Sequence, residues 1–323
     1  MNIFNNLSEI VNDFEVVVFD ANGVLWGGDN FFDGVLPLLE NLMKNGKIVY
    51  ILSNSTFRSK FTVDRYEQYG LKRDVHYTKI MTNGEIVHDF LMKELLEFKS
   101  KSKVKTYFNL FFPNNELFEG TKYKKVDNIE NADFVYVGIP RIHSSQTEMV
   151  EKFKSKISNF GENAKTFFDT GDDVWYDCIS IEPFMEAIEQ VKKLGLPALN
   201  INPDFTAKEN GKFVTRQGSI ANELKKLGLE VVEFGKPLYI TFENALVDVA
   251  NVDKDKILMI GDAIPNDIKG ANNFGIKSAL TLETGVTANE IFKNNQIDEP
   301  KLEKLLQKYD ATCDFFIKKV SDS

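Results

Sequence analysis

The chain has 323 residues, 43% of them hydrophobic and 27% charged, which is the composition of a folded globular protein rather than a disordered one. Its formal net charge of −9 argues against a nucleic-acid partner, because duplex-binding proteins present a basic face to the phosphate backbone. The apolar runs have the length of strands and fall far short of the ~20 residues that span a bilayer, so no membrane segment is predicted.

In the first part of the chain, buried strands alternate with amphipathic helices. Residues 15–20 (EVVVFD) form a continuous β-branched run, which is typical of a strand covered on both faces. Further strands are predicted at 47–53 and 77–82, and helices at 36–44, 59–69 and 85–98. This order predicts a parallel sheet covered by helices.

The middle of the chain predicts a second α/β unit, and the pattern of the first unit returns near the end. The middle has predicted strands at 104–110, 132–139 and 198–202, and helices at 146–160 and 183–194. The last part has predicted strands at 256–262 and 277–282, which flank a helix at 266–274. The predicted fold class is therefore α/β, with a Rossmann-like parallel core and an inserted α/β domain.

The two cysteines, Cys178 and Cys313, do not form a CxxC or Cys/His cluster, so the sequence predicts no zinc site. Free thiols in a reducing compartment are the favoured interpretation, and a single disulfide stays open as the alternative. The N-terminal residues lack the basic segment and apolar run of a secretory signal. We therefore expect a cytoplasmic protein.

Four short polar segments follow predicted strands or lie just beyond them, at the edge where open α/β sheets bind ligands. They are Asp20 with the ANGVLW segment after it, Ser53-Asn54-Ser55-Thr56, Gly235-Lys236-Pro237, and Gly261-Asp262 with Asp267. Each has an ordinary structural explanation, because Asp and Ser commonly cap helices and turns. Their order and their shared place at strand ends favour a joint chemical role.

Together these segments resemble the motifs of the haloacid dehalogenase superfamily over nearly the whole chain. FDANGVLW resembles the first motif, SNST the second, FGKP the third and MIGDAIPNDIKGANNFGIKSAL the fourth. LETGVTANE, ADFVYVGIPR and NPDF are similar to segments of the NagD-like subclass IIA, whose large α/β cap is inserted after the third core strand. The resemblance implies a core at 1–82 and 236–323 and a cap at 83–235.

The resemblance also implies a Mg²⁺-dependent phosphatase that acts on a small phosphorylated metabolite. Asp20 is the implied nucleophile, since a carboxylate can attack phosphorus and form an acyl phosphate. The implied Mg²⁺ ligands are Asp20, Asp262 and the backbone carbonyl of Asn22, with Asp267 either as a further ligand or as a residue that supports the ligands, because Mg²⁺ prefers hard oxygen ligands. A homodimer formed through the cap is one arrangement that the resemblance allows.

The other implied roles concern the phosphate group. Ser53 and Asn54, with nearby backbone N–H groups, would bind the phosphoryl oxygens. Lys236 would contact the same group and offset the charge that develops beside Asp20 during transfer.

Asn22 departs from the resembled pattern, in which most phosphatases carry a second aspartate two positions after the nucleophile. That aspartate protonates the leaving group and then activates water, and a side-chain amide can do neither at neutral pH. General acid–base catalysis contributes roughly 10²–10⁴-fold. Three interpretations stay open: a phosphatase or phosphotransferase of reduced competence, a non-catalytic phosphate- or metabolite-binding protein, and a hydrolase of another bond.

Overall fold

The computed structural model describes residues 2–101, 103–112, 115–158, 174–209, 212–293 and 296–321, and the chain forms two compact units. The first unit contains Met1–Ile86 and Gly235–Ser323, and the second contains Val87–Phe234. The predicted boundaries fall four residues earlier and one residue later than these. The first difference arises because the opening turn of α3 (Asn83–Met92) packs on loops of the first unit.

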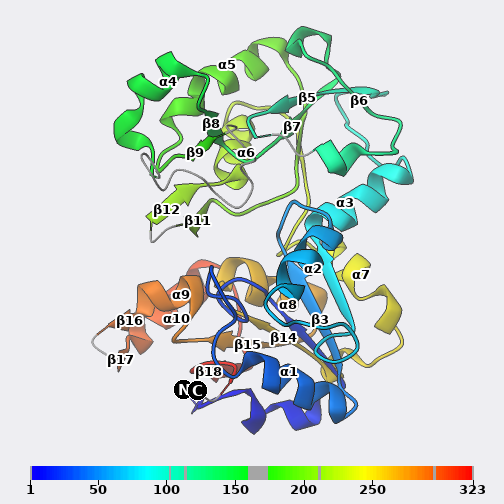
Figure 1. The fold of residues 1–323 in the computed structure, drawn as a ribbon, viewed down its shortest axis with the longest axis vertical. Coiled ribbons are helices and arrows are strands. Elements are labelled where there is room, and N and C mark those ends of the chain that lie inside the picture. Colours follow the sequence, from blue (N-terminus) through cyan, green and yellow to red (C-terminus); the bar gives the residue numbers. More distant parts are fainter. Residues whose placement is uncertain are drawn as a thin grey trace. The chain divides into compact units, whose positions relative to one another are not determined.

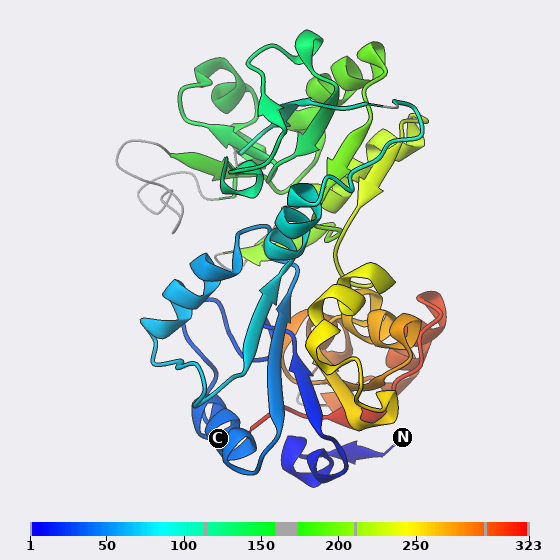
Figure 2. The ribbon, with the colours of Figure 1, turned by 90° about the vertical axis from the view of Figure 1, so that its right-hand side faces the viewer.

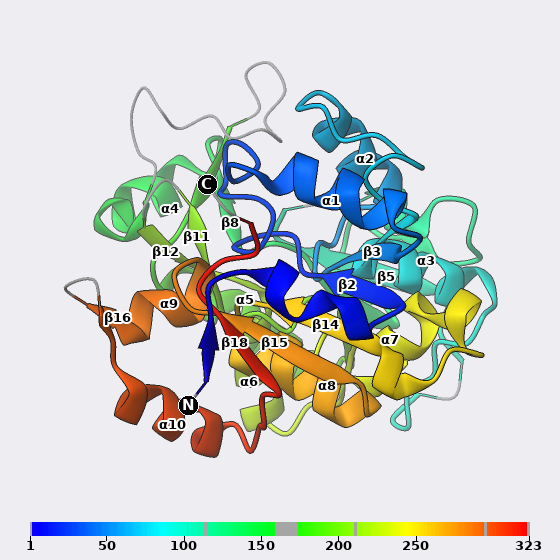
Figure 3. The ribbon, with the colours of Figure 1, turned by 90° about the horizontal axis from the view of Figure 1, so that it is seen from below.

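The first unit is built on a seven-stranded sheet in which all neighbouring strands are parallel. Its central strands are continuous apolar runs, such as VVVF, because both faces of the sheet are covered. The order is β1 (Ile3–Phe4), β18 (Phe315–Ile317), β15 (Lys277–Thr281), β14 (Ile257–Gly261), β2 (Val16–Phe19), β3 (Ile48–Ser53) and β4 (Lys79–Thr82), and Figure 3 shows its part from β18 to β3 from below.

Helices cover this sheet on both faces. They include α1 (Val35–Lys44), α2 (Ser59–Glu67), α7 (Tyr239–Ala245), α8 (Lys269–Phe274), α9 (Gly285–Ile291) and α10 (Glu299–Lys308). Successive residues of a strand point to opposite faces, so the two faces have separate apolar layers. Val17 and Phe19 of β2 belong to the layer of α1 and α2, whereas Val16 and Val18 belong to that of α7 and α8.

The second unit has a five-stranded parallel sheet of its own, shown in Figures 1 and 2. Its order is β13 (Val231–Glu233), β10 (Ala198–Asn200), β7 (Phe134–Val137), β5 (Thr106–Leu110) and β6 (Lys124–Lys125). Counted along the chain from the β6 edge, these strands have the doubly wound order 2-1-3-4-5. One face packs against α5 (Met185–Leu194) and α6 (Gln217–Lys226). The predicted α/β class is thus confirmed.

Short antiparallel pairs complete the described structure. They are β8 (Arg141–His143) with β9 (Trp175–Asp177), β11 (Thr206–Glu209) with β12 (Lys212–Thr215), and β16 (Phe292–Lys293) with β17 (Gln296–Ile297). Within the described ranges, no helix is both long and apolar enough to cross a membrane.

Several predicted helices differ in length from the observed ones. α3 ends at Met92 instead of 98, because Glu94 adopts a positive φ of 59° that interrupts the helix. α4 (Thr147–Lys152) is followed by a 3-10 turn, and residues 159 and 160 of the predicted helix lie outside the described residues. The helix predicted at 266–274 is a π-helical segment, Ile264–Ile268, followed by α8.

A buried ion cluster joins three segments of the second unit. The Arg141 guanidinium donates to both carboxylate oxygens of Asp177, at 3.0 and 3.1 Å, and Arg216 donates at 2.9 Å. Burial raises the pKa of Asp177, but the two guanidinium groups outweigh it and hold that pKa below its usual value. The resulting stabilisation is fully present above the pKa of about 3.9 that Asp has in the unfolded chain. It is lost as the pH falls through the lower pKa that Asp177 has in the folded protein.

Candidate active site

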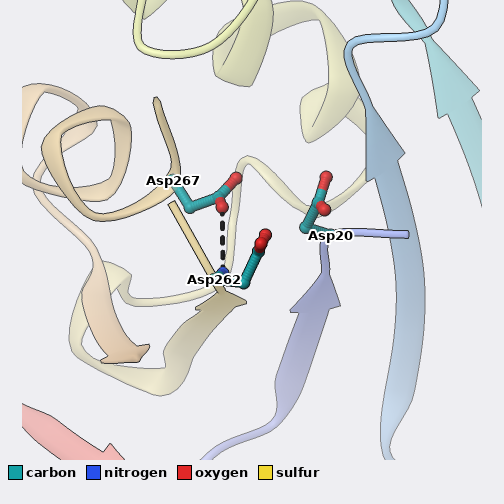
Figure 4. A group of neighbouring side chains, drawn as sticks. All are labelled: Asp20, Asp262 and Asp267. Atoms are coloured by element: carbon teal, nitrogen blue, oxygen red, sulfur yellow. Dashed lines mark hydrogen bonds between the residues drawn. The ribbon is translucent and has the colours of Figure 1, made fainter. Parts of the chain in front are cut away.

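Three carboxylates meet at the carboxyl edge of the first unit's sheet. Asp20 lies one residue beyond β2, Asp262 lies one residue beyond the adjacent β14, and Asp267 belongs to the π-helical segment that follows. Figure 4 shows the three side chains gathered at the ends of these strands. One oxygen atom from each carboxylate lies within 4.8 Å of the others. Parallel pairing therefore joins residues that are more than 240 positions apart in sequence.

Asp267 is bound by backbone groups at the end of β14. Its Oδ2 accepts hydrogen bonds from the N–H groups of Asp262, at 3.1 Å, and Ala263, at 3.0 Å; Figure 4 draws the first. Gly261 makes this contact possible, because a Cβ there would lie 2.1 Å from the Cβ of Asp267. The wide π-helical turn returns the Asp267 carboxylate to the strand end.

Asp262 is held by the N-terminus of α9 and by two glycines. The Val286 N–H donates to Asp262 Oδ2 at 2.5 Å, and the Thr287 N–H donates to its carbonyl oxygen at 3.1 Å. A Cβ at Gly23 or Gly285 would lie 2.5 or 2.0 Å from Asp262 Oδ2. Both glycines have positive φ, 86° and 83°, which other residues rarely adopt. Residues 285–289 (GVTAN) thus contact the Asp262 carboxylate from one side.

Lys236 supplies positive charge to the cluster. Its side chain is 1% exposed, and its ammonium group contacts Asp20 Oδ1, Asp267 Oδ1 at 2.7 Å and the Leu52 carbonyl oxygen at 2.9 Å. Three acceptors match the three protons of an ammonium group. Burial lowers the pKa of Lys236, but the carboxylates of Asp20 and Asp267 outweigh it and hold that pKa above its ordinary value. Lys236 is therefore a fixed cation rather than a base.

The cluster has an excess of negative charge. Among the described residues that form it, three carboxylates share the single ammonium group of Lys236. Burial, followed by the charges of Asp20 and Asp267, raises the pKa of Asp262 well above its usual value. Carboxylate oxygens at this spacing are a donor set that suits a hard divalent cation. Such a cation would remove the repulsion that the ion pair with Lys236 leaves uncompensated.

Ser53 and Asn54 lie beside this cluster, at the end of β3. Ser53 is 4% exposed, and its hydroxyl oxygen accepts a hydrogen bond from the Ser55 N–H at 3.2 Å. The Asn54 side chain is directed to the backbone of Lys236: it accepts from the Lys236 N–H at 2.9 Å and donates to the Lys236 carbonyl oxygen at 3.3 Å. Phosphate binding by Ser53 and Asn54 stays a prediction.

Asn22 lies exposed in the loop that follows Asp20. Hydrogen bonds from the Gly23 N–H to the Trp26 carbonyl oxygen, at 2.8 Å, and from the Trp26 N–H to the Ala21 carbonyl oxygen, at 2.9 Å, close the loop. Trp26 anchors it, because its side chain is 1% exposed and packs edge-on against Phe31 with ring centroids 5.0 Å apart. The predicted contact of the Asn22 carbonyl oxygen with a metal stays a prediction.

Asn83 is a buried residue of this edge that the sequence analysis missed. It is fully buried at the first position of α3 and donates a hydrogen bond to Asn54 Oδ1 at 3.1 Å. A signal for it was present, because Asn83 directly follows the predicted strand at 77–82, just as Asp20 ends the strand at 15–20.

Two family models match separate parts of the chain. One, described as haloacid dehalogenase-like hydrolase, matches residues 17–106 and includes Asp20. The other, described as HAD-hydrolase-like, matches residues 233–305 and includes Lys236, Asp262 and Asp267. The chain therefore belongs to the haloacid dehalogenase-like hydrolases, as its motifs predicted.

Similar proteins extend over nearly the whole chain. A 4-nitrophenylphosphatase of Schizosaccharomyces pombe is 24% identical over 288 residues, which are 87% of this chain and 88% of that protein. A haloacid dehalogenase-like hydrolase of Brucella suis has a similar structure, with a TM-score of 0.70, 18% identity and coverage of 98% and 99% of the two chains. NagD of E. coli gives a TM-score of 0.58 at 16% identity, over 96% and 98%. The predicted NagD-like fold, inserted unit included, is thus confirmed.

The close approach of Gly285 to Asp262 yields a stability prediction. Gly285→Ala should destabilise the first unit more than Gly46→Ala, whose φ of 76° is similar but whose added Cβ would meet nothing within 4 Å. Both changes carry the left-handed penalty of about 1–2 kcal/mol, and only Gly285→Ala adds an overpacking cost of about 1–3 kcal/mol.

Urea unfolding in a Trp175→Phe background measures this difference, because Trp26 is then the single tryptophan and lies in the first unit. Equal losses of unfolding free energy in the two variants would show that Asp262 is not packed against Gly285.

Proposed function

We propose that this chain is a Mg²⁺-dependent phosphatase that cleaves small phosphate esters through an aspartyl phosphate at Asp20. The observation that carries the proposal is the buried pair of Asp20 and Lys236 within a cluster of three carboxylates. Family membership supports the hydrolase class, and the name of the S. pombe relative supports phosphate monoesters as substrates.

In this proposal Asp20 attacks the phosphorus atom. Lys236 binds Asp20 Oδ1 and so orients the carboxylate, whose other oxygen forms the new bond to phosphorus while the bond to the ester oxygen breaks. The ammonium group of Lys236 offsets the negative charge that accumulates during transfer, and it needs no reorganisation because Asp267 and the Leu52 carbonyl oxygen already hold it.

A divalent cation bound by Asp20, Asp262 and the Asn22 carbonyl oxygen would neutralise charge on the phosphate and polarise it. In this proposal Asp267 does not bind the cation directly. Its Oδ1 contacts Lys236 and its Oδ2 accepts from two backbone N–H groups, so it organises the residues around the cation.

Asn22 sets the balance between the two half-reactions. Aryl and acyl phosphates have stable leaving groups that depart with little protonation, so Asp20 can be phosphorylated without a general acid. Hydrolysis of the aspartyl phosphate requires deprotonation of water, and the Asn22 amide cannot accept that proton. The aspartyl phosphate should therefore form faster than it breaks down, and activated esters should react faster than sugar or alkyl phosphates.

A non-catalytic phosphate-binding protein is the alternative that Asn22 favours. In that case the carboxylates would hold a cation and a phosphate without bond cleavage. Covalent labelling of Asp20 separates the two functions, because only the enzyme forms an aspartyl phosphate.

Mg²⁺ should raise the melting temperature of the metal-free chain. A ligand that binds only the folded state at 100 times its Kd adds about 2.7 kcal/mol of stability. Asp262→Asn should abolish most of the shift. Asp248→Asn, a surface change in the same unit at a side chain 58% exposed, should preserve it. Differential scanning calorimetry with and without millimolar Mg²⁺ is the measurement, and a folded wild-type chain whose melting temperature does not respond would refute the cation site.

Asn22→Asp should accelerate turnover of 4-nitrophenyl phosphate by up to roughly the 10²–10⁴-fold of a restored acid–base group. Rapid-quench labelling with an activated phosphate should show label accumulating on wild-type Asp20 and accumulating less on Asn22→Asp. Asp20→Asn is the control and should take no label.

Two outcomes would count against this account of Asn22. Rapid wild-type turnover of alkyl phosphates without accumulated label would show that another group acts as the base. Absence of label in both the wild type and Asn22→Asp would favour the binding protein.

A further inference from the structure

The side-chain amide of Asn54 forms hydrogen bonds to the backbone of Lys236 through both its oxygen and its nitrogen atom. Oδ1 accepts from the Lys236 N–H at 2.9 Å, and Nδ2 donates to the Lys236 carbonyl oxygen at 3.3 Å. Asn54 is 8% exposed, so water competes little for either contact. A two-point contact of this kind fixes both the position and the orientation of the Lys236 backbone.

Asn83 adds a third hydrogen bond to this arrangement. Its Nδ2 donates to Asn54 Oδ1 at 3.1 Å, and the residue is fully buried. That bond identifies Oδ1 as the acceptor end of the Asn54 amide, because Oδ1 then receives two donors. The hydrogen bonds therefore run from Asn83 through Asn54 to Lys236.

The start of α3 is itself firmly held. The Gly84 N–H donates to the Ser55 carbonyl oxygen at 3.1 Å, and a Cβ at Gly84 would lie 2.3 Å from the Thr56 carbonyl oxygen. Arg58 makes two hydrogen bonds to the Glu85 carboxylate, at 2.9 and 2.7 Å. Asn83 consequently approaches Asn54 from a rigid support.

These contacts involve the two chain segments of the first unit that lead into the second unit and return from it. Asn83 stands four residues before the second unit begins at Val87, and Lys236 is the second residue after that unit ends at Phe234. The hydrogen bonds of Asn54 thus connect the segment that leaves the first unit with the segment that returns to it. Because the Lys236 ammonium group has three specific acceptors, a shift of its backbone would disturb all three contacts.

We propose that Asn54 is a positioning residue for Lys236, and that Asn83 acts on Lys236 through Asn54. The inference rests on the proposed function in one respect: Lys236 must assist the chemistry at Asp20 for its position to affect turnover. It also makes a structural claim about Lys236 that can be tested without any activity.

The kinetic test measures the phosphorylation of Asp20 by 4-nitrophenyl phosphate with Mg²⁺ in a single turnover by rapid quench, because steady-state turnover would report the slower breakdown of the aspartyl phosphate. Asn54→Ala should lower the maximal phosphorylation rate between about tenfold and 100-fold, the effect of displacing a reacting group by about 1 Å. The substrate concentration that gives half of that rate should stay within about twofold of the wild-type value, because a positioning residue acts on the transition state more than on substrate binding. Asn83→Ala keeps both bonds between Asn54 and Lys236, so its phosphorylation rate should fall only about fivefold.

The double variant tests whether the two residues act along one route. If Asn83 acts through Asn54, Asn83→Ala should lower the phosphorylation rate no further when Asn54 is already alanine. Asn6→Ala is the matched control, since Asn6 is another buried asparagine of the first unit whose side chain accepts from the Ser8 N–H at 2.9 Å. It should leave the phosphorylation rate of the folded protein unchanged.

Acetylation by an N-hydroxysuccinimide ester, read by mass spectrometry, tests the structural claim separately. Lys236 should react slowly in the wild type and severalfold faster in Asn54→Ala, while Lys79, whose ammonium group pairs with Asp248, reacts equally in both. If Asp20→Asn retains full activity, the proposed function fails, and faster labelling of Lys236 would still support the positioning. A variant that raises only the half-saturating substrate concentration, or one with an unchanged phosphorylation rate and unchanged labelling, would overturn the proposal; the first result would return Asn54 to phosphate binding.

Discussion

The buried ammonium group of Lys236 is the interaction on which the site depends. An ammonium group taken out of water is costly unless its partners are well placed, and removing one partner of a buried pair costs about 3–5 kcal/mol. Lys236 meets that requirement with Asp20, Asp267 and the Leu52 carbonyl oxygen. These partners come from β2, from the segment after β14 and from β3, which adjoin in the parallel sheet. The strand order therefore decides whether the lysine can be buried at all.

The same cluster departs from the arrangement of charges and packing that would favour stability alone. Burial first, and then the charges of Asp20 and Asp267, which one ammonium group balances only in part, raise the pKa of Asp262. Gly23, Gly261 and Gly285 allow the backbone to come within contact distance of the carboxylates, at positions where a Cβ would collide. Local rules of packing and charge are thus broken at one edge of the sheet, while its two faces keep ordinary apolar layers, as functional sites often require.

Sequence reasoning succeeded where one local signal decides the outcome. The strands β2 and β14 match their predicted ranges to within a residue or two at each end, because continuous apolar runs identify strands covered on both faces. Asp20 and Asp262 follow such strands directly, so their approach to one another at the sheet edge could be predicted, whereas their roles stay predictions. The direction of the Asn54 side chain and the part of Asn83 could not be predicted, since Asn54 and Lys236 are 182 positions apart. The contact of Val286 with Asp262 likewise depends on how α9 packs, which no single motif encodes.

A crystal structure of the chain grown with Mg²⁺ and beryllium fluoride would test the central claim most directly, because BeF₃⁻ on an aspartate mimics an aspartyl phosphate. The account predicts BeF₃⁻ bonded to the Asp20 carboxylate, Lys236 within hydrogen-bond distance of a fluorine or of Asp20, and Mg²⁺ coordinated by Asp20 and Asp262. BeF₃⁻ bonded to Asp262 or Asp267, or Mg²⁺ bound away from Asp20 with the Asp20 carboxylate unmodified, would contradict it.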